Sequence, residues 1–148
     1  MIIYCDGACP SNGKSTKGGI GIYSDFPGIS RSIIYTDNPT NQRCELSAIL
    51  ETLYIIELME SETEFVIKTD SMYSVNCINK WVNSWKKNGW KSANRQPVKN
   101  KEIIEEIDTT LSEIRKTKKV TIEWVKAHTG VKDGNYYADL LANEALKI

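Results

Sequence analysis

The hydrophobic pattern of this chain changes after residue 40. Before that point, residues 1–8, 19–25 and 29–36 are short segments rich in Ile and Tyr and separated by Gly, Pro and Asn, which predicts three strands joined as a meander. After it, apolar residues at helical spacing alternate with single apolar runs. Strands first, then alternating helices and strands, predict an α/β fold with a mixed sheet covered by helices.

The second part of the chain is expected to add two strands, at residues 64–69 and 120–125, because each is a short apolar run with polar neighbours. The most regular helical pattern covers residues 41–59, with Thr40 or Asn41 as N-cap. Further helices are predicted at residues 71–78, 79–87, 103–114 and 135–146, and a polar loop at 88–99. The last helix carries a stripe of small residues suited to close packing on a sheet.

Length and composition favour one domain over residues 1–148, since no repeat or linker divides the chain and 41% of it is hydrophobic. The apolar run at residues 2–5 is too short for a signal peptide. No segment approaches the roughly 18 apolar residues that span a bilayer. We therefore expect a soluble, intracellular, monomeric protein with no membrane partner, cytoplasmic in a prokaryote.

Cysteine spacing and charge distribution narrow the possible partners. The four cysteines form no CxxC pair and no cluster with His128, the only histidine, which disfavours zinc and predicts free thiols. The net charge is zero, yet residues 71–101 contain seven Lys or Arg and no acid. Within that stretch, tryptophans interleave with lysines, a pattern suited to binding nucleic acid. The residues are Trp81, Trp85, Lys86, Lys87, Trp90 and Lys91. The alternative is that the tryptophans are core anchors and the lysines a solvated face.

Four carboxylates carry the chemical interpretation, although each has an ordinary explanation by itself. Asp6 follows an apolar run and could begin a turn, and Asp70 follows a strand and could cap a helix. Glu45 lies in the first turn of the long helix, where it favours the helix dipole. Asp139 borders the small-residue stripe of the last helix and could be a surface residue. Together they would repel one another unless divalent cations bind between them.

Oxygen ligands select hard ions, so the cofactor predicted for these acids is Mg²⁺, with Mn²⁺ able to substitute. Two such ions suit phosphodiester hydrolysis without a side-chain nucleophile. His128 lies between a strand and Gly130, where it could move a proton to or from water or the leaving group. The alternative is a plain loop histidine.

At this point the motifs resemble those of type 1 ribonuclease H along nearly the whole chain. They are, in order, residues 4–8 (YCDGA), 40–46 (TNQRCEL), 69–73 (TDSMY), 81–100 (WVNSWKKNGWKSANRQPVKN), 123–130 (EWVKAHTG) and 135–139 (NYYAD). The resemblance implies a five-stranded mixed sheet of order 3-2-1-4-5, flanked by helices on both faces. It also implies endonucleolytic cleavage of the RNA strand of RNA–DNA hybrids, leaving 5′-phosphate and 3′-hydroxyl ends with little sequence specificity.

The resemblance also implies roles for individual residues. Asp6, Glu45, Asp70 and Asp139 match the metal-binding carboxylates, and His128 matches a mobile-loop histidine that assists turnover without binding metal. The amide groups of Asn12, Asn41 and Gln42 are expected to contact the backbone of the hybrid. Thr40 is expected to contact a phosphate of the hybrid. Residues 81–99, the basic flap, are expected to grip the DNA strand. Met72 and Asn76 depart from the glutamines that some members carry.

Other readings of the sequence stay open. A DNA nuclease of the resolvase type would share the fold, since fold alone does not fix substrate. A catalytically silent nucleic-acid-binding module is a second alternative, although binding alone would not require acids near phosphates. A domain of a reverse transcriptase polyprotein is a third.

Overall fold

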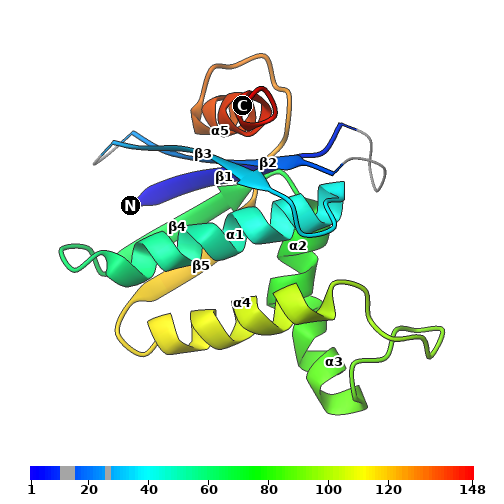
Figure 1. The fold of residues 1–148 in the computed structure, drawn as a ribbon. Coiled ribbons are helices and arrows are strands. Elements are labelled where there is room, and N and C mark those ends of the chain that lie inside the picture. The colour runs from blue at the N-terminus through cyan, green and yellow to red at the C-terminus, as the bar shows by residue number, and fades with distance from the viewer. Residues whose placement is uncertain (11–15, 26–27) are drawn as a thin grey trace.

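Five strands form one mixed sheet in the computed structural model, which describes residues 1–10, 16–25 and 28–148 (Figure 1). The strands are β1 (Ile2–Ala8), β2 (Gly18–Ser24), β3 (Ile29–Tyr35), β4 (Glu64–Thr69) and β5 (Lys119–Trp124). Their order is β3-β2-β1-β4-β5; the β1–β2 and β2–β3 pairs are antiparallel, and the β1–β4 and β4–β5 pairs are parallel. The five predicted strands and the implied order are therefore confirmed.

The helical elements are α1 (Asn41–Leu58), α2 (Met72–Asn76), η1 (Cys77–Trp81), α3 (Val82–Asn88), α4 (Lys101–Ile114) and α5 (Gly134–Ala145). The predicted boundary between residues 78 and 79 is wrong, because η1 is a turn of π-helix that joins α2 directly to α3. A π turn adds a residue and rotates the apolar face of a helix. The shifted pattern in the sequence resembled two helices.

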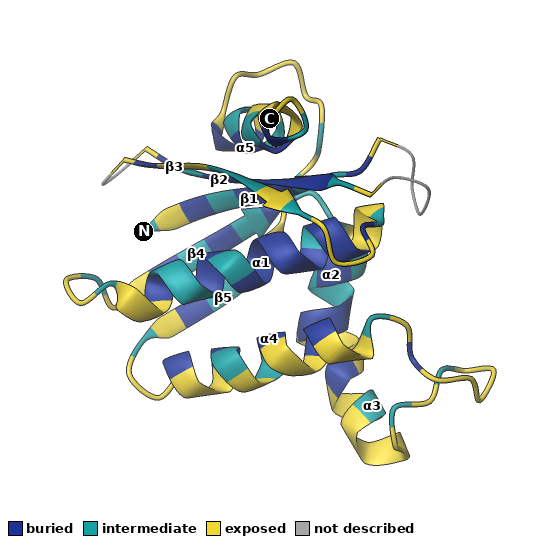
Figure 2. Ribbon diagram, in the orientation of Figure 1, coloured by how far each residue is buried: buried dark blue, intermediate teal, exposed yellow. Residues whose placement is uncertain are grey.

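Helices cover the two faces of the sheet separately. α5 lies on one face, α1 lies against the other, and α4 packs on the far side of α1, while α2, η1 and α3 run away from the sheet (Figure 1). The apolar stripe of α4, which includes Ile104 and Ile107, is buried. Buried residues line the interfaces between the layers, and the outer helix faces are exposed (Figure 2). All four cysteines are buried and free of disulfides, as predicted. Within the described ranges, no helix combines the length and apolarity needed to cross a membrane.

α5 approaches the sheet unusually closely because β2 presents glycines to it. A Cβ atom on Gly21 would lie 2.0 Å from the backbone oxygen of Ala138, and one on Gly19 would lie 2.0 Å from that of Ala142. Ala138, Ala142 and Ala145 are fully buried. The predicted packing of the small-residue stripe on the sheet is confirmed, and it fixes the position of Asp139 next to Ala138.

The β2–α5 contact gives a stability prediction. Gly21→Ala places a methyl group against helix backbone, which cannot rotate away as a side chain can, so we expect the free energy of unfolding to fall by about 1–3 kcal/mol. Urea unfolding followed by circular dichroism measures the loss. Ser30→Ala, at an exposed position of β3, is the control and should change stability by less than about 0.5 kcal/mol. Equal stability of Gly21→Ala and wild type would contradict this account of the packing.

Candidate active site

Asp6 lies within β1 with only 4% of its surface exposed. Side chains alternate along the strand, so Ile3 and Cys5 enter the core on one face while Asp6 points to the other. Its strand partner in β2 is Gly21, which faces α5. The Oδ1 atom of Asp6 accepts a hydrogen bond from the backbone N–H of Gly7 at 2.9 Å.

Glu45 reaches Asp6 because Gly7 has no side chain. A Cβ atom on Gly7 would lie 2.5 Å from the carbonyl carbon of Cys44 and 2.6 Å from the backbone nitrogen of Glu45. The backbone of α1 therefore passes directly over β1 at this point. The Gly7 N–H donates to Glu45 Oε1 as well as to Asp6. Glu45 begins the second turn of α1 rather than lying in its first turn, and it is half-buried instead of solvated.

Asp70 follows β4, whose parallel pairing with β1 brings the ends of the two strands together. The alternative role of Asp70 as a helix cap is wrong, because Ser71 is the N-cap of α2 and its hydroxyl accepts from the N–H of Ser74. The carboxylate of Asp70 does not cap a helix and lies in the candidate site, where its Oδ2 accepts a hydrogen bond from Asn135 Nδ2 at 3.3 Å. Its backbone oxygen accepts from Trp124 Nε1 at 3.1 Å.

Asp6, Glu45 and Asp70 together form the carboxylate cluster, in which one oxygen of each lies within 4.8 Å of the others. Burial, then the charge of Glu45, raises the pKa of Asp6 well above its ordinary value. Burial likewise raises the pKa of Glu45, opposed by hydrogen bonds with Asp6 and with the Gly7 N–H and helped by the charge of Asp70. No ion pair joins these acids to a basic side chain within the described residues. Like charges at this separation require a bound cation or bound protons.

Asp139 lies beside the cluster, outside its tightest group. A hydrogen bond with Asp139 contributes to the raised pKa of Asp6, so the two carboxyl groups are neighbours. Asn143, one turn later in α5, donates to the backbone oxygen of Asp139 at 2.9 Å and to its Oδ1 at 3.4 Å. The structure thus brings all four predicted acids to one place, three of them within 4.8 Å.

His128 is exposed in the loop between β5 and α5 and has a positive φ of 52°, which is uncommon for a residue other than glycine. It lines a small pocket with Asn135, Tyr136 and Asp139. The imidazole therefore borders the acidic site without belonging to the carboxylate cluster.

The predicted backbone contacts gather at the start of α1. Thr40 is the N-cap, its Oγ1 accepting from the Arg43 N–H at 3.1 Å, and Asn41 and Gln42 are exposed in the first turn. Arg43 is buried and holds this segment through ion pairs with Asp37 at 3.1 Å and Glu102 at 2.5 Å. Asn12 lies outside the described residues.

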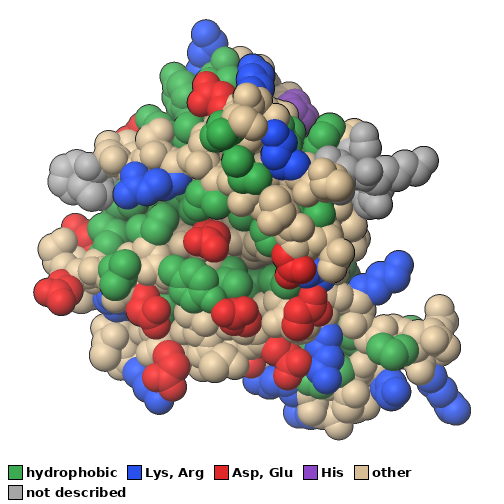
Figure 3. All heavy atoms as spheres, in the orientation of Figure 1, with side chains coloured by type: hydrophobic (Ala, Val, Ile, Leu, Met, Phe, Trp, Pro, Cys, Tyr) green, Lys and Arg blue, Asp and Glu red, His purple; other side chains and the backbone are tan. Residues whose placement is uncertain are grey.

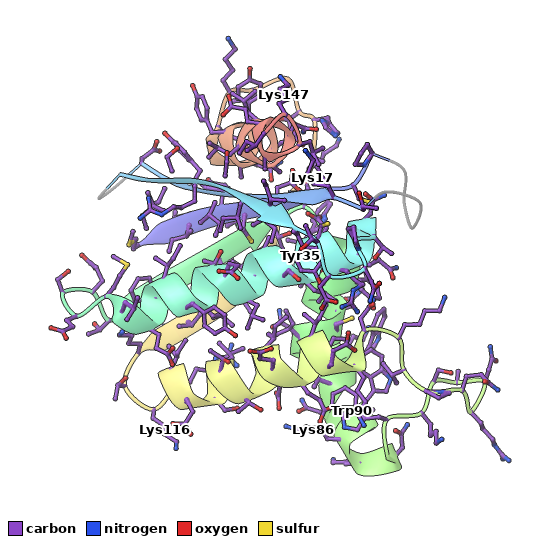
Figure 4. The ribbon with its side chains drawn as sticks, in the orientation of Figure 1. Lys17, Tyr35, Lys86, Trp90, Lys116 and Lys147 are labelled. Carbon is purple, nitrogen blue, oxygen red and sulfur yellow. The ribbon has the colours of Figure 1, made fainter. Side chains whose placement is uncertain are left out.

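In the basic flap, the tryptophans and lysines have features of both a core anchor and a nucleic-acid-binding surface. The rings of Trp81, Trp85 and Trp90 follow one another at centroid distances of 5.9 and 6.0 Å. Trp85 and Trp90 also pack against the core, so they are anchors in part. Lys86 pairs with Asp108 of α4 at 3.0 Å, a partner that sequence reasoning missed because it lies 22 residues away (Figure 4). Lys87 and Lys91 are exposed.

Sequence reasoning also missed Asn135 as a member of the site. The signal was present: Asn135 stands four residues before Asp139, and residues at that spacing share a helix face. Gly7 was noted only as part of a motif, whereas its missing side chain is what admits Glu45.

Comparison with known proteins agrees with this geometry. The sequence model of the RNase H family matches residues 1–147. Ribonuclease H of Francisella philomiragia and that of Francisella tularensis subsp. novicida are each 39% identical over 147 residues, which is 99% of this chain and 90% of theirs. The solution structure of the PFV RNase H domain superposes with a TM-score of 0.72 at 26% identity, covering 97% of this chain and 92% of that one.

A second structural relative is the foamy viral protease-reverse transcriptase, solved in complex with an RNA/DNA hybrid. It has a TM-score of 0.72 and 26% identity over 97% of this chain, which corresponds to only 19% of the viral chain. Fold, sequence and the arrangement of acids lead to one conclusion: this chain belongs to the RNase H family and is an endoribonuclease.

Proposed function

We propose that this protein hydrolyses the RNA strand of RNA–DNA hybrids within the strand, leaving 5′-phosphate and 3′-hydroxyl ends, with little sequence specificity. The observation that carries the proposal is the carboxylate cluster, in which Asp6 of β1, Asp70 directly after β4 and Glu45 in the second turn of α1 lie within 4.8 Å. Membership of the RNase H family and the hybrid bound to a structural relative support the choice of substrate.

The proposed cofactor is Mg²⁺, with Mn²⁺ able to substitute, in a two-metal site. The donor set fits hard divalent ions because it consists of carboxylate oxygens, with neither sulfur nor imidazole in the cluster. Burial and neighbouring carboxylates raise the pKa values of Asp6 and Glu45, as expected for acids that lack a compensating cation. When bound, the ions would supply an activated water and stabilise the leaving oxygen.

We propose that each protein group has a separate task. Asp6, in β1, and Asp70, directly after the neighbouring strand β4, would hold the cations at a fixed place at the end of the sheet. Glu45 and Asp139 would complete the ligand set from helices on opposite faces. The imidazole of His128, exposed at the bordering pocket, would carry a proton to or from water or the leaving group.

Two surfaces are proposed to hold the hybrid. The exposed amides of Asn41 and Gln42 and the Thr40 hydroxyl lie at the N-terminus of α1, where the helix dipole favours phosphates. Asn12 is proposed to join them. Lysines and arginines gather around α3 and the loop after it, whereas acids gather over α1 and α4 (Figure 3). The basic flap would bind the DNA strand through Lys87, Lys91 and the tryptophan rings.

Asp70→Asn tests the catalytic role. The amide keeps the shape of the side chain but removes a charged ligand, so we expect cleavage of a labelled hybrid in Mg²⁺ to fall at least about 100-fold, or about 2.7 kcal/mol in the barrier. Wild type should cut the RNA strand in Mg²⁺, not in EDTA, and should leave duplex RNA and duplex DNA intact. Glu113→Gln, an exposed acid on α4, is the matched control and should retain full activity. Near-normal cleavage by Asp70→Asn would refute the assigned role.

The proposed flap contacts predict a change in salt dependence. Replacing both Lys87 and Lys91 by Ala should raise KM and reduce the slope of log KM against log salt by about 2, since each lost phosphate contact removes roughly one unit. Lys86→Ala alone should change KM and the slope less, because Lys86 already forms an ion pair with Asp108. Lys116→Ala, in the turn just after α4, is the control. Unchanged KM and slope in the double variant would show that these lysines form an ordinary solvated face and do not bind the hybrid.

Replacing Asp6 by Asn should stabilise the metal-free protein, although the same change removes a proposed metal ligand. Because the folded-state pKa of Asp6 is raised, the folded protein binds more protons than the unfolded chain, and stability falls as pH rises above about 4. Asp6→Asn should therefore raise the free energy of unfolding in EDTA at pH 8 by about 1–2 kcal/mol, with a smaller gain at pH 5. Mg²⁺ should stabilise wild type and not the variant. A variant less stable than wild type at pH 8 would contradict the electrostatic account.

A further inference from the structure

Asn135, in the first turn of α5, is an uncharged residue at the edge of an acidic site. Only 5% of it is exposed. Its Nδ2 donates to Asp70 Oδ2 at 3.3 Å, and its Oδ1 is buried with no hydrogen-bond partner among the described residues. Asn135 also lines the pocket that His128 and Asp139 border.

The orientation of this amide is fixed by chemistry. The amide nitrogen is the only side-chain donor of Asn135 and it faces Asp70 Oδ2, so the amide oxygen faces away. The oxygen then loses contact with water and gains no bond in return, which is a net cost to the fold. An unpaired buried group of this kind is rare in native proteins and calls for an explanation other than stability.

The backbone around Asn135 is held independently of Asp70. Asp133 caps α5, its Oδ1 accepting from the Tyr136 N–H at 3.0 Å. Gly134 packs on the ring of Tyr4, where a Cβ atom would lie 2.0 Å from Cδ1. The first turn of α5 is therefore anchored on β1, and Asn135 presents its amide to Asp70 from a rigid element.

Asp70 has reason to need this donor. Two other acids of the site, Asp6 and Glu45, lie within 4.8 Å of it, and like charges at that separation repel one another. A lysine or arginine would orient the carboxylate but would also neutralise the charge that a cation needs. An amide orients the carboxylate and leaves its charge intact, which is how outer residues commonly hold metal ligands.

We propose that Asn135 is a positioning residue that holds Asp70 in the orientation that binds the divalent cation. This inference rests on the proposed function, because it assigns Asp70 to a metal site. The inference goes beyond the proposed function because Asn135 is uncharged and is not itself a metal ligand. It nevertheless controls metal affinity and turnover, at a cost in stability.

Asn135→Ala separates this role from a structural one. Calorimetric titration with Mg²⁺ alone should show a Kd raised roughly tenfold, within the range for lost outer contacts to metal ligands. In saturating Mg²⁺, kcat for hybrid cleavage should fall at least about tenfold, while KM for the hybrid stays unchanged. Tm in EDTA should not fall, because the substitution also removes the unpaired oxygen.

Asn135→Asp is the second variant, since it keeps the size of the side chain but cannot donate to Asp70. Its added charge should preserve or strengthen Mg²⁺ binding, yet kcat should fall as in the alanine variant. Glu144→Ala is the control, because it shortens an exposed side chain near the C-terminal end of the same helix. Its Kd, kcat and Tm should equal those of wild type.

The outcomes distinguish the two proposals. Absence of Mg²⁺ binding by the wild-type protein would overturn the proposed function itself. Mg²⁺ binding by wild type, together with unchanged Kd and kcat in Asn135→Ala, would overturn the role of Asn135 alone. Turnover by Asn135→Asp at the wild-type rate would also overturn it, because the donor would then be dispensable.

Discussion

Asp6, Glu45 and Asp70 are carboxyl groups within 4.8 Å of one another that repel when ionised, and the elements that meet at this point hold them there. β1 contributes Asp6, the segment directly after its parallel neighbour β4 contributes Asp70, and α1 contributes Glu45 from one face of the sheet. The Gly7 N–H, which donates to both Asp6 and Glu45, offsets part of the repulsion. A divalent cation would offset the rest.

Close backbone packing makes this arrangement possible. Gly7 allows α1 to approach β1, and Gly19 and Gly21 allow α5 to approach β2 from the other face. Each helix thereby brings one acid close to Asp6 of β1: α1 brings Glu45, and α5 brings Asp139. Side chains of ordinary size at these glycines would separate the layers and disperse the acids. The tight packing and the metal chemistry are thus two consequences of one set of contacts.

Much of the fold was predictable from local pattern. Apolar alternation and helical spacing located the five strands and the helices α1, α4 and α5, and the alanine stripe of α5 indicated close packing. The π turn η1 was not predicted, because its extra residue imitates a helix boundary. The strand order came from the family resemblance, since periodicity contains no information on which strands pair.

The site was predictable in its acids and less so in its supporting contacts. The individual roles of Asp6, Glu45 and Asp70 were ambiguous until their mutual electrostatics and the family motifs were considered together. That Ser71 caps α2, releasing Asp70, depends on a one-residue choice between equivalent capping residues. The Lys86–Asp108 and Asn135–Asp70 contacts join residues far apart in sequence, and such pairings arise only when the layers assemble.

The occupancy of the carboxylate cluster is the central claim of this account, and anomalous diffraction from crystals soaked in Mn²⁺ measures it most directly. We expect anomalous peaks at coordinating distance, about 2.1 Å, from oxygens of Asp6, Glu45 and Asp70. Well-occupied Mn²⁺ sites elsewhere on the protein, with no peak at these three carboxylates, would contradict it.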